Sequence, residues 1–134
     1  MSSELARNAW GIILHHVQDG IVELRWLPGQ MTDGAFKATL ALLALEAEKV
    51  RPSSLLVDAS KFSHRPGRGV MQWRDDCVVP RYGSAGVKKF AFHAPAGFPN
   101  TIEAGGKAVV EEPAIFSTAW FSERQHALDW LRET

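Results

Sequence analysis

The residue types best suited to binding a ligand gather in one short segment, SKFSHRPGR, at residues 60–68. Arg65 and Arg68 supply positive charge just before a predicted helix, whose free N–H groups also favour a phosphate or a carboxylate. We therefore predict a weak anion site formed by the side chains of Ser60, Ser63, His64, Arg65 and Arg68. The other interpretation is that these are solvated loop residues that bind nothing.

Asp58 precedes this segment and ends an apolar run. Its carboxylate could orient a catalytic group, but an aspartate at the end of a strand more often caps a turn or pairs with a nearby arginine. We expect the structural role.

The histidines do not form a metal site. His15 and His16 are adjacent on a predicted strand, so their side chains point to opposite faces and cannot share a metal ion. The other three lack the spacing of metal ligands: His64, His93 and His126. We expect no metal and no cofactor.

Catalysis needs a nucleophile and a base that converge, and the sequence indicates no such pair. Cys77 falls on the apolar side of a predicted helix, where a buried thiol is the common case. Asp75 and Asp76 are neighbours on the same helix and point about 100° apart, unlike carboxylates that act together as acid and base. Catalysis is therefore less favoured by the sequence than regulation or ligand binding.

The strands that would position these residues begin with a β-hairpin. Residues 12–17 and 21–27 are apolar-rich runs joined through Asp19 and Gly20, a pair typical of a tight turn. Three further runs predict strands, at 55–58, 88–93 and 115–121. The first of these is apolar up to its final Asp58, which indicates a central strand buried on both faces.

Helices are expected to alternate with these strands. Thr32 is suited to the N-cap of a helix that reaches about residue 49. A second helix, over 69–79, is expected to end before Pro80. Ser122 and Gln125 have the spacing of a capping box, which predicts the start of the last helix.

Residues 94–113 are rich in Pro and Gly, which leaves at best a short helix near 101–104. The order of elements predicts an α/β fold with a mixed, mostly parallel five-stranded sheet opened by the hairpin, and three to four helices.

The helix that begins after Thr32 is apolar on two sides. One stripe is expected to face the core and consists of Phe36, Leu40, Leu43, Ala47 and Val50. A second apolar face consists of Ala38, Ala41, Leu42 and Leu45. This face is either covered within the domain or joined to another subunit, and we expect a homodimer through it.

The chain has 134 residues, the size of one domain, and we expect a single domain over 1–134. Hydrophobic residues make up 46% and charged residues 22%, as in ordinary globular proteins. Fifteen basic residues balance 15 acidic ones, so the net charge favours no nucleic-acid partner. No apolar run approaches the roughly 20 residues that cross a bilayer. The single cysteine and the absence of a secretion signal at the N-terminus indicate the cytoplasm.

Several segments resemble the STAS-like superfamily, in particular its bacterial branch that is similar to the sporulation anti-sigma-factor antagonist. These segments are IVELRWLPGQMTD, LLVDASKF, VMQW and FSERQHALDWL. In those antagonists a strand ending in Asp-x-Ser is followed by an Asp-Ser pair whose serine is phosphorylated. Asp58-Ala59-Ser60 matches the first part, but Pro66 and Gly67 stand where the pair is expected. The resemblance therefore does not imply the phosphoserine switch.

Two functions are predicted ahead of an enzyme. The first is a non-catalytic STAS-like regulatory or protein-interaction module. The alternative is a protein that binds a small apolar or anionic ligand at the carboxyl ends of the central strands, between residues 60–68 and 95–100. The resemblance allows this alternative because the superfamily shares its general shape with a lipid-transfer fold.

Overall fold

The computed structural model describes residues 2–94, 110–111 and 116–133. Its centre is a mixed seven-stranded sheet with the order β1-β2-β3-β4-β5-β7-β6. The strands are β1 Ser2–Arg7, β2 Gly11–His16, β3 Ile21–Trp26, β4 Ser54–Asp58, β5 Lys89–His93, β6 Val110–Glu111 and β7 Ser117–Phe121. The expected α/β fold with a mixed sheet is confirmed.

The prediction of five strands, mostly parallel, is wrong in two respects. Strands β3, β4, β5 and β7 run parallel to one another, whereas β1, β2 and β3 pair antiparallel and so do β6 and β7. The strand β1 was not expected because most of its side chains are exposed. Only Leu5 and Ala6 of β1 pack against the core, so this edge strand carries no alternating apolar pattern from which to predict it.

The predicted hairpin is confirmed as β2 and β3, which pair from Gly11 opposite Trp26 to His16 opposite Ile21. Its turn differs from the expected tight turn. The short 3-10 helix η1 Val17–Asp19 connects the strands and is closed by Gly20 at a φ of 66°. Only the glycine adopts a left-handed conformation there, as its missing Cβ allows.

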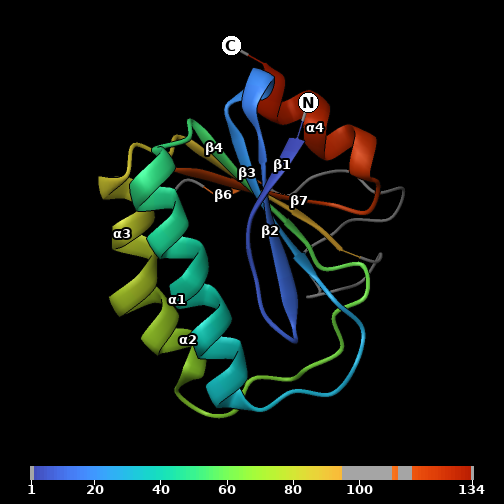
Figure 1. Cartoon of the computed structure of the whole chain (residues 1–134), viewed down its shortest axis with the longest axis vertical. Coiled ribbons are helices and arrows are strands. Elements are labelled where there is room, and N and C mark those ends of the chain that lie inside the picture. Colours follow the sequence, from blue (N-terminus) through green and yellow to red (C-terminus); the bar gives the residue numbers. More distant parts are fainter. Residues whose placement is uncertain (1, 95–109, 112–115, 134) are drawn as a thin grey trace.

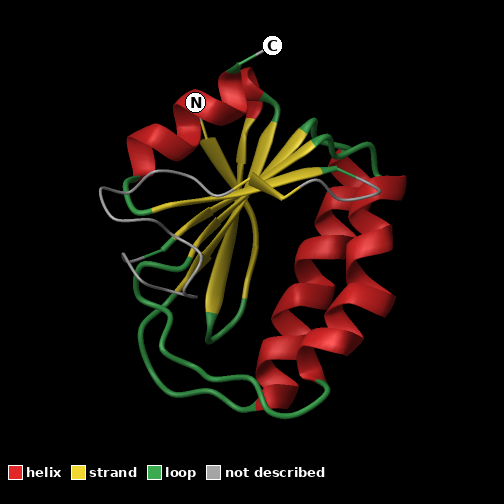
Figure 2. Ribbon diagram, turned by 180° about the vertical axis from the view of Figure 1, so that it is seen from behind, coloured by secondary structure: helices red, strands yellow, loops and turns green. Residues whose placement is uncertain are grey.

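The helices are α1 Asp33–Val50, the consecutive α2 Val70–Trp73, η2 Arg74–Val78 and α3 Val79–Ser84, and finally α4 Arg124–Arg132. Figure 1 shows α1 lying beside the α2–α3 stretch, and Figure 2 shows both on one side of the sheet with α4 on the other. The larger core cluster lies between the sheet and α1 to α3, and a smaller one lies under α4. Among the described helices, none is both long enough and apolar enough to span a membrane.

One helix start is confirmed and the other is wrong. The Thr32 side chain accepts a hydrogen bond from the backbone N–H of Ala35 at 3.1 Å, so Thr32 is the N-cap of α1. The predicted capping box is absent from α4, which has Glu123 at its N-cap and no side-chain cap. Gln125 instead donates to Asp129 one turn further along the helix.

The helical stretch after Gly69 was predicted to end before Pro80. It continues to Ser84 instead. The π-helical turn η2 precedes the proline, and its wider i to i+5 spacing delays the helix by about one residue. Val78 is therefore buried at 1% exposure in the place that an unbroken α-helix gives to Cys77. Cys77 is exposed, and the prediction of a core thiol is wrong.

The second apolar face predicted on α1 is partly buried in the domain and partly exposed. Leu42 is half-buried and packs against the larger core cluster. Ala41 is also half-buried. Ala38 is exposed, and Leu45 is 43% exposed. Only Ala38 and Leu45 thus face away from the domain.

Candidate functional site

The parallel strands place two hollows on opposite faces of the sheet. Arg25, Asp58 and His93 are in register on β3, β4 and β5 and lie on the face that α4 covers in part. The neighbouring residues along these strands point to the opposite face, which α1 to α3 cover, because side chains alternate along a strand. Trp26 lines both hollows. We call them the charged pocket and the apolar cavity.

The apolar cavity has a volume of about 610 Å³ and lies between the sheet and helices α1, α2 and α3. The sheet and the residues just after its strands contribute Trp26, Val57, Ala59, Phe90, Phe92, Ala94, Phe116, Thr118 and Trp120. The helices and the loop at 60–68 contribute Phe36, Leu40, Phe62, His64, Arg65, Pro66, Met71, Arg74, Asp75, Val79 and Tyr82. Most of its wall is therefore aromatic or aliphatic.

Aromatic rings support one another along the wall of the apolar cavity. The rings of Trp26 and Phe36 are stacked with centroids 5.6 Å apart, and Phe62 lies 4.9 Å from Trp26. On the sheet, Phe92 stacks between Phe90 at 4.7 Å and Trp120 at 5.6 Å. Rings that pack on each other present faces and edges to the cavity that suit a planar or aromatic ligand.

The loop at 60–68 is anchored to the start of α1 by Asp33. One carboxylate oxygen of Asp33 lies 2.8 Å from Nε2 of His64, and the backbone N–H of Gly67 donates to the same oxygen at 3.1 Å. These hydrogen bonds, led by the one from His64, lower the pKa of Asp33. A Cβ on Gly67 would lie 2.5 Å from the other carboxylate oxygen, so a larger residue at this position would have to displace the Asp33 side chain.

Two arginines border the apolar cavity. Arg74 donates to Asp75 at 2.9 Å, which offsets its charge. Arg65 is exposed and, among the described residues, has no ion-pair partner. The cavity thus has one uncompensated positive charge at its border, in the loop that the sequence predicts to bind an anion.

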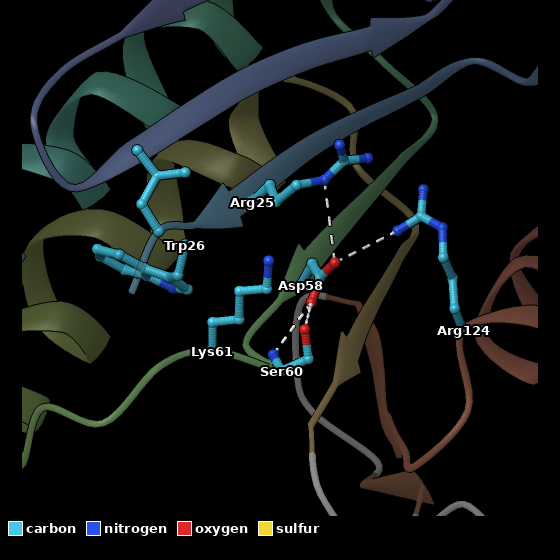
Figure 3. A pocket seen from close by; sticks show the side chains of 7 residues that line it. Arg25, Trp26, Asp58, Ser60, Lys61 and Arg124 are labelled. Atoms are coloured by element: carbon cyan, nitrogen blue, oxygen red, sulfur yellow. Dashed lines mark hydrogen bonds and ion pairs between the residues drawn. The ribbon is translucent and has the colours of Figure 1, made fainter. Parts of the chain in front are cut away.

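The charged pocket, on the other face of the sheet, has a volume of about 260 Å³. Its lining consists of Arg25, Trp26, Leu27, Asp58, Ser60, Lys61 and Arg124. Figure 3 shows Arg25 and Arg124 converging on Asp58 from two sides, with nitrogen-to-oxygen distances of 3.9 and 3.7 Å. Ser60 donates to Asp58 from its hydroxyl at 2.6 Å and from its backbone N–H at 3.0 Å. Asp58 thus joins the strand to the loop, as its expected structural role requires.

Glu23 lies behind the charged pocket and is fully buried in the middle of β3. Arg124, the first residue of α4, donates to both of its carboxylate oxygens at 2.8 Å, and Nε2 of His16 lies 2.7 Å away. Burial alone would raise the pKa of Glu23, but the hydrogen bonds from Arg124 and His16 outweigh it and lower the pKa. The charge is therefore retained inside the protein.

Asp58 is also held ionised. Burial would raise its pKa, but His93 and the two hydrogen bonds from Ser60 bring the pKa far below its ordinary value. Nδ1 of His93 lies 3.4 Å from Asp58 and is the only buried side-chain nitrogen or oxygen of the described residues without a hydrogen bond. The contact between His93 and Asp58 is thus close but poorly aligned.

The five residues predicted to bind an anion do not share one hollow. Ser60 lines the charged pocket, whereas His64 and Arg65 line the apolar cavity. Ser63 and Arg68 are exposed and line neither. The segment at 95–100, expected on the other side of the ligand, lies outside the described residues.

Sequence reasoning missed the two partners Glu23 and Arg124. Glu23 alternates with apolar residues on a strand and Arg124 is among polar residues at a helix start, and charged residues in either pattern normally face solvent. The two residues are 101 positions apart, and no local pattern relates positions so distant. Within the described part of the chain, no group of three or more His, Cys, Asp or Glu side chains could hold a metal ion.

The chain matches no protein family, no curated protein and no solved structure. The resemblance to the STAS-like superfamily therefore rests on the sequence patterns, and the structure supports an α/β fold with a mixed sheet.

Proposed function

We propose that the protein binds an apolar small molecule in the apolar cavity, between the sheet and helices α1 to α3. The observation that carries this proposal is a cavity of about 610 Å³ whose wall is formed mainly by aromatic and aliphatic side chains. Pockets for small molecules commonly measure about 300–1,000 Å³ and combine apolar walls with a few polar groups. The cavity has both properties.

The position of Arg65 supports a ligand with an anionic end. Arg65 borders the cavity, and no described residue neutralises its charge. Arginine binds carboxylates and phosphates through two parallel hydrogen bonds. A ligand with an apolar body and a carboxylate therefore fits the cavity better than a hydrocarbon does.

Filling the cavity tests this function. Val79 lines the cavity from α3, whereas Val17 in η1 is 57% exposed and lines neither hollow. Val79→Trp and Val17→Trp make the same change at these two positions. In a titration with 1-anilinonaphthalene-8-sulfonate, a fluorescent apolar anion, we expect wild type and Val17→Trp to bind alike and Val79→Trp to bind at least about tenfold more weakly. Equal binding by all three proteins would exclude the cavity as the site.

A second proposal is the STAS-like regulatory or protein-interaction module, formed by a homodimer and lacking the usual phosphoserine switch. The sequence patterns support it, as does the exposed apolar side chain of Leu45 on the outer face of α1. Leu45→Glu should convert a dimer to a monomer in sedimentation at micromolar concentration, and Val17→Glu should not. A wild-type protein that is monomeric under these conditions would remove the dimer.

A further inference from the structure

Tyr82 lines the apolar cavity and has a hydroxyl without a hydrogen-bond partner among the described residues. It lies in α3, is 2% exposed, and packs its ring 5.5 Å from that of Phe90. No described residue forms a hydrogen bond with its hydroxyl. Among the described residues, His93 Nδ1 is the only fully buried polar side-chain atom without a partner. The unpartnered oxygen of Tyr82 is therefore not fully buried. The open space that Tyr82 lines is the apolar cavity.

A hydroxyl in this position needs an explanation beyond packing. Buried tyrosine hydroxyls usually find a partner, since an unpaired polar group in an apolar setting costs free energy. Phenylalanine would fill the same space in the wall without that cost. An unpaired group at the wall of a cavity is best explained by a partner that the ligand supplies.

The surroundings of Tyr82 favour a ligand that accepts the hydrogen bond. Burial raises the pKa of the phenol above its ordinary value, so the hydroxyl keeps its proton at neutral pH. Arg74 and Arg81 lower that pKa by their positive charge, though by less than burial raises it. A phenol that keeps its proton is a hydrogen-bond donor, and a carbonyl or carboxylate oxygen of a ligand is a suitable acceptor for it.

Thr118 adds a second hydroxyl to the same wall. It lies on β7 opposite Phe90, is 9% exposed, and lines the cavity. Its hydroxyl likewise has no hydrogen-bond partner among the described residues. Phe90 therefore lies next to both polar groups in an otherwise apolar part of the wall.

We infer that the ligand carries a carbonyl or carboxylate oxygen within its apolar body, and that the hydroxyl of Tyr82 donates a hydrogen bond to this oxygen. This inference rests on the proposed function, because it assigns the chemistry of a ligand in the same cavity. Tyr82 is then a specificity-determining residue that separates acceptor-bearing ligands from hydrocarbons of the same shape.

Two probes of matched shape test the inference. Benzophenone and diphenylmethane both carry two phenyl rings, and only benzophenone has a carbonyl acceptor. Affinities are measured by displacement of 1-anilinonaphthalene-8-sulfonate from wild type and from Tyr82→Phe. We expect the ratio of the two affinities to fall about fivefold to tenfold in Tyr82→Phe, the loss of one hydrogen bond. Only the affinity for benzophenone should change.

The outcomes separate the inference from the proposed function. If both probes bind and their affinity ratio is the same in wild type and Tyr82→Phe, the inference is overturned and the cavity remains a binding site. If neither probe binds, the proposed function fails, and the inference fails with it. Thermal unfolding without ligand checks the variant, and Tyr82→Phe should be at least as stable as wild type because no bond in the protein is lost. A clear drop in stability would also overturn the inference, since it would reveal a partner within the protein.

Discussion

Glu23 and Arg124 are separated by 101 positions and joined by two hydrogen bonds of 2.8 Å, which connect the middle of β3 to the first residue of α4. Glu23 is fully buried, so this pair fixes α4 on the sheet by a contact that water cannot replace. An unpaired charge at this depth is costly, whereas the pair itself adds less to stability than its short distances suggest.

Removing one partner of this pair should be more damaging than removing both. We expect Arg124→Met to lower the free energy of unfolding by about 3 kcal/mol, because it leaves the Glu23 carboxylate buried without its main partner. The double variant with Glu23→Met should be more stable than Arg124→Met alone. Urea unfolding followed by circular dichroism measures wild type, Arg124→Met, Glu23→Met and the double variant. Losses that simply add would show that the two side chains do not interact.

Stability should fall in acid because of the buried carboxylates. The pKa values of Glu23 and Asp58 are lowered in the folded protein, so the unfolded chain binds more protons as the pH falls. The stabilisation is present above the unfolded pKa values of about 4 and is lost progressively below them. Urea midpoints between pH 7 and pH 3 should therefore decline mainly below about pH 5.

Glu23→Gln should flatten this decline. Glu48→Gln is the matched control, because the Glu48 carboxylate pairs with Arg81 at an exposed position. An exposed ion pair contributes little to stability, so the control should keep the slope of wild type. Equal slopes for wild type and Glu23→Gln would exclude Glu23 as a source of the acid sensitivity.

Gly67→Ala should release the loop at 60–68 from α1. The added methyl group would lie 2.5 Å from the Asp33 carboxylate and displace the hydrogen bonds that Asp33 accepts from Gly67 and His64. We expect a loss of about 1–2 kcal/mol in the free energy of unfolding. In an Asp33→Ala background the same substitution should cost much less, since the obstructing carboxylate is gone. An equal cost in both backgrounds would mean that the clash with Asp33 is not the cause.

Arg65 and Arg68 should differ in their effect on anionic ligands, although both belong to the predicted anion site. Arg65 borders the apolar cavity and Arg68 does not. Arg65→Gln should weaken binding of 4-benzoylbenzoate about fivefold or more and leave neutral benzophenone unchanged. Arg68→Gln should change neither affinity. If Arg68→Gln has the larger effect, the anion binds outside the cavity.

Some features that local pattern determines were predicted correctly, although the capping box at Ser122 was not. Thr32 precedes a helix and can only cap it from that position, so its role follows from neighbouring residues. The strand β4 follows from an unbroken apolar run, since a strand buried on both faces needs one.

Other missed features depend on contacts between distant segments or on one inserted residue. The π-helical turn moved Cys77 to the surface, and no composition rule marks where a helix will widen. Arg124 looked like a solvated residue at a helix start, because its partner Glu23 is far away in the sequence. The cavity was likewise invisible, since its wall joins α1, α3 and four strands of the sheet.

Trp26 borders both hollows, with its indole almost fully enclosed at 3% exposure. A substitution at this position would disturb both at once, so its effect on binding could not be attributed to either. The unaltered Trp26 side chain is instead useful as an optical reporter, because it contacts both hollows. Because the chain has five tryptophans, its fluorescence is assigned to Trp26 only when the other four are replaced by phenylalanine. In that background the signal responds to the polarity on each side of the sheet, and the variants of Arg65 and Arg124 can be compared through it.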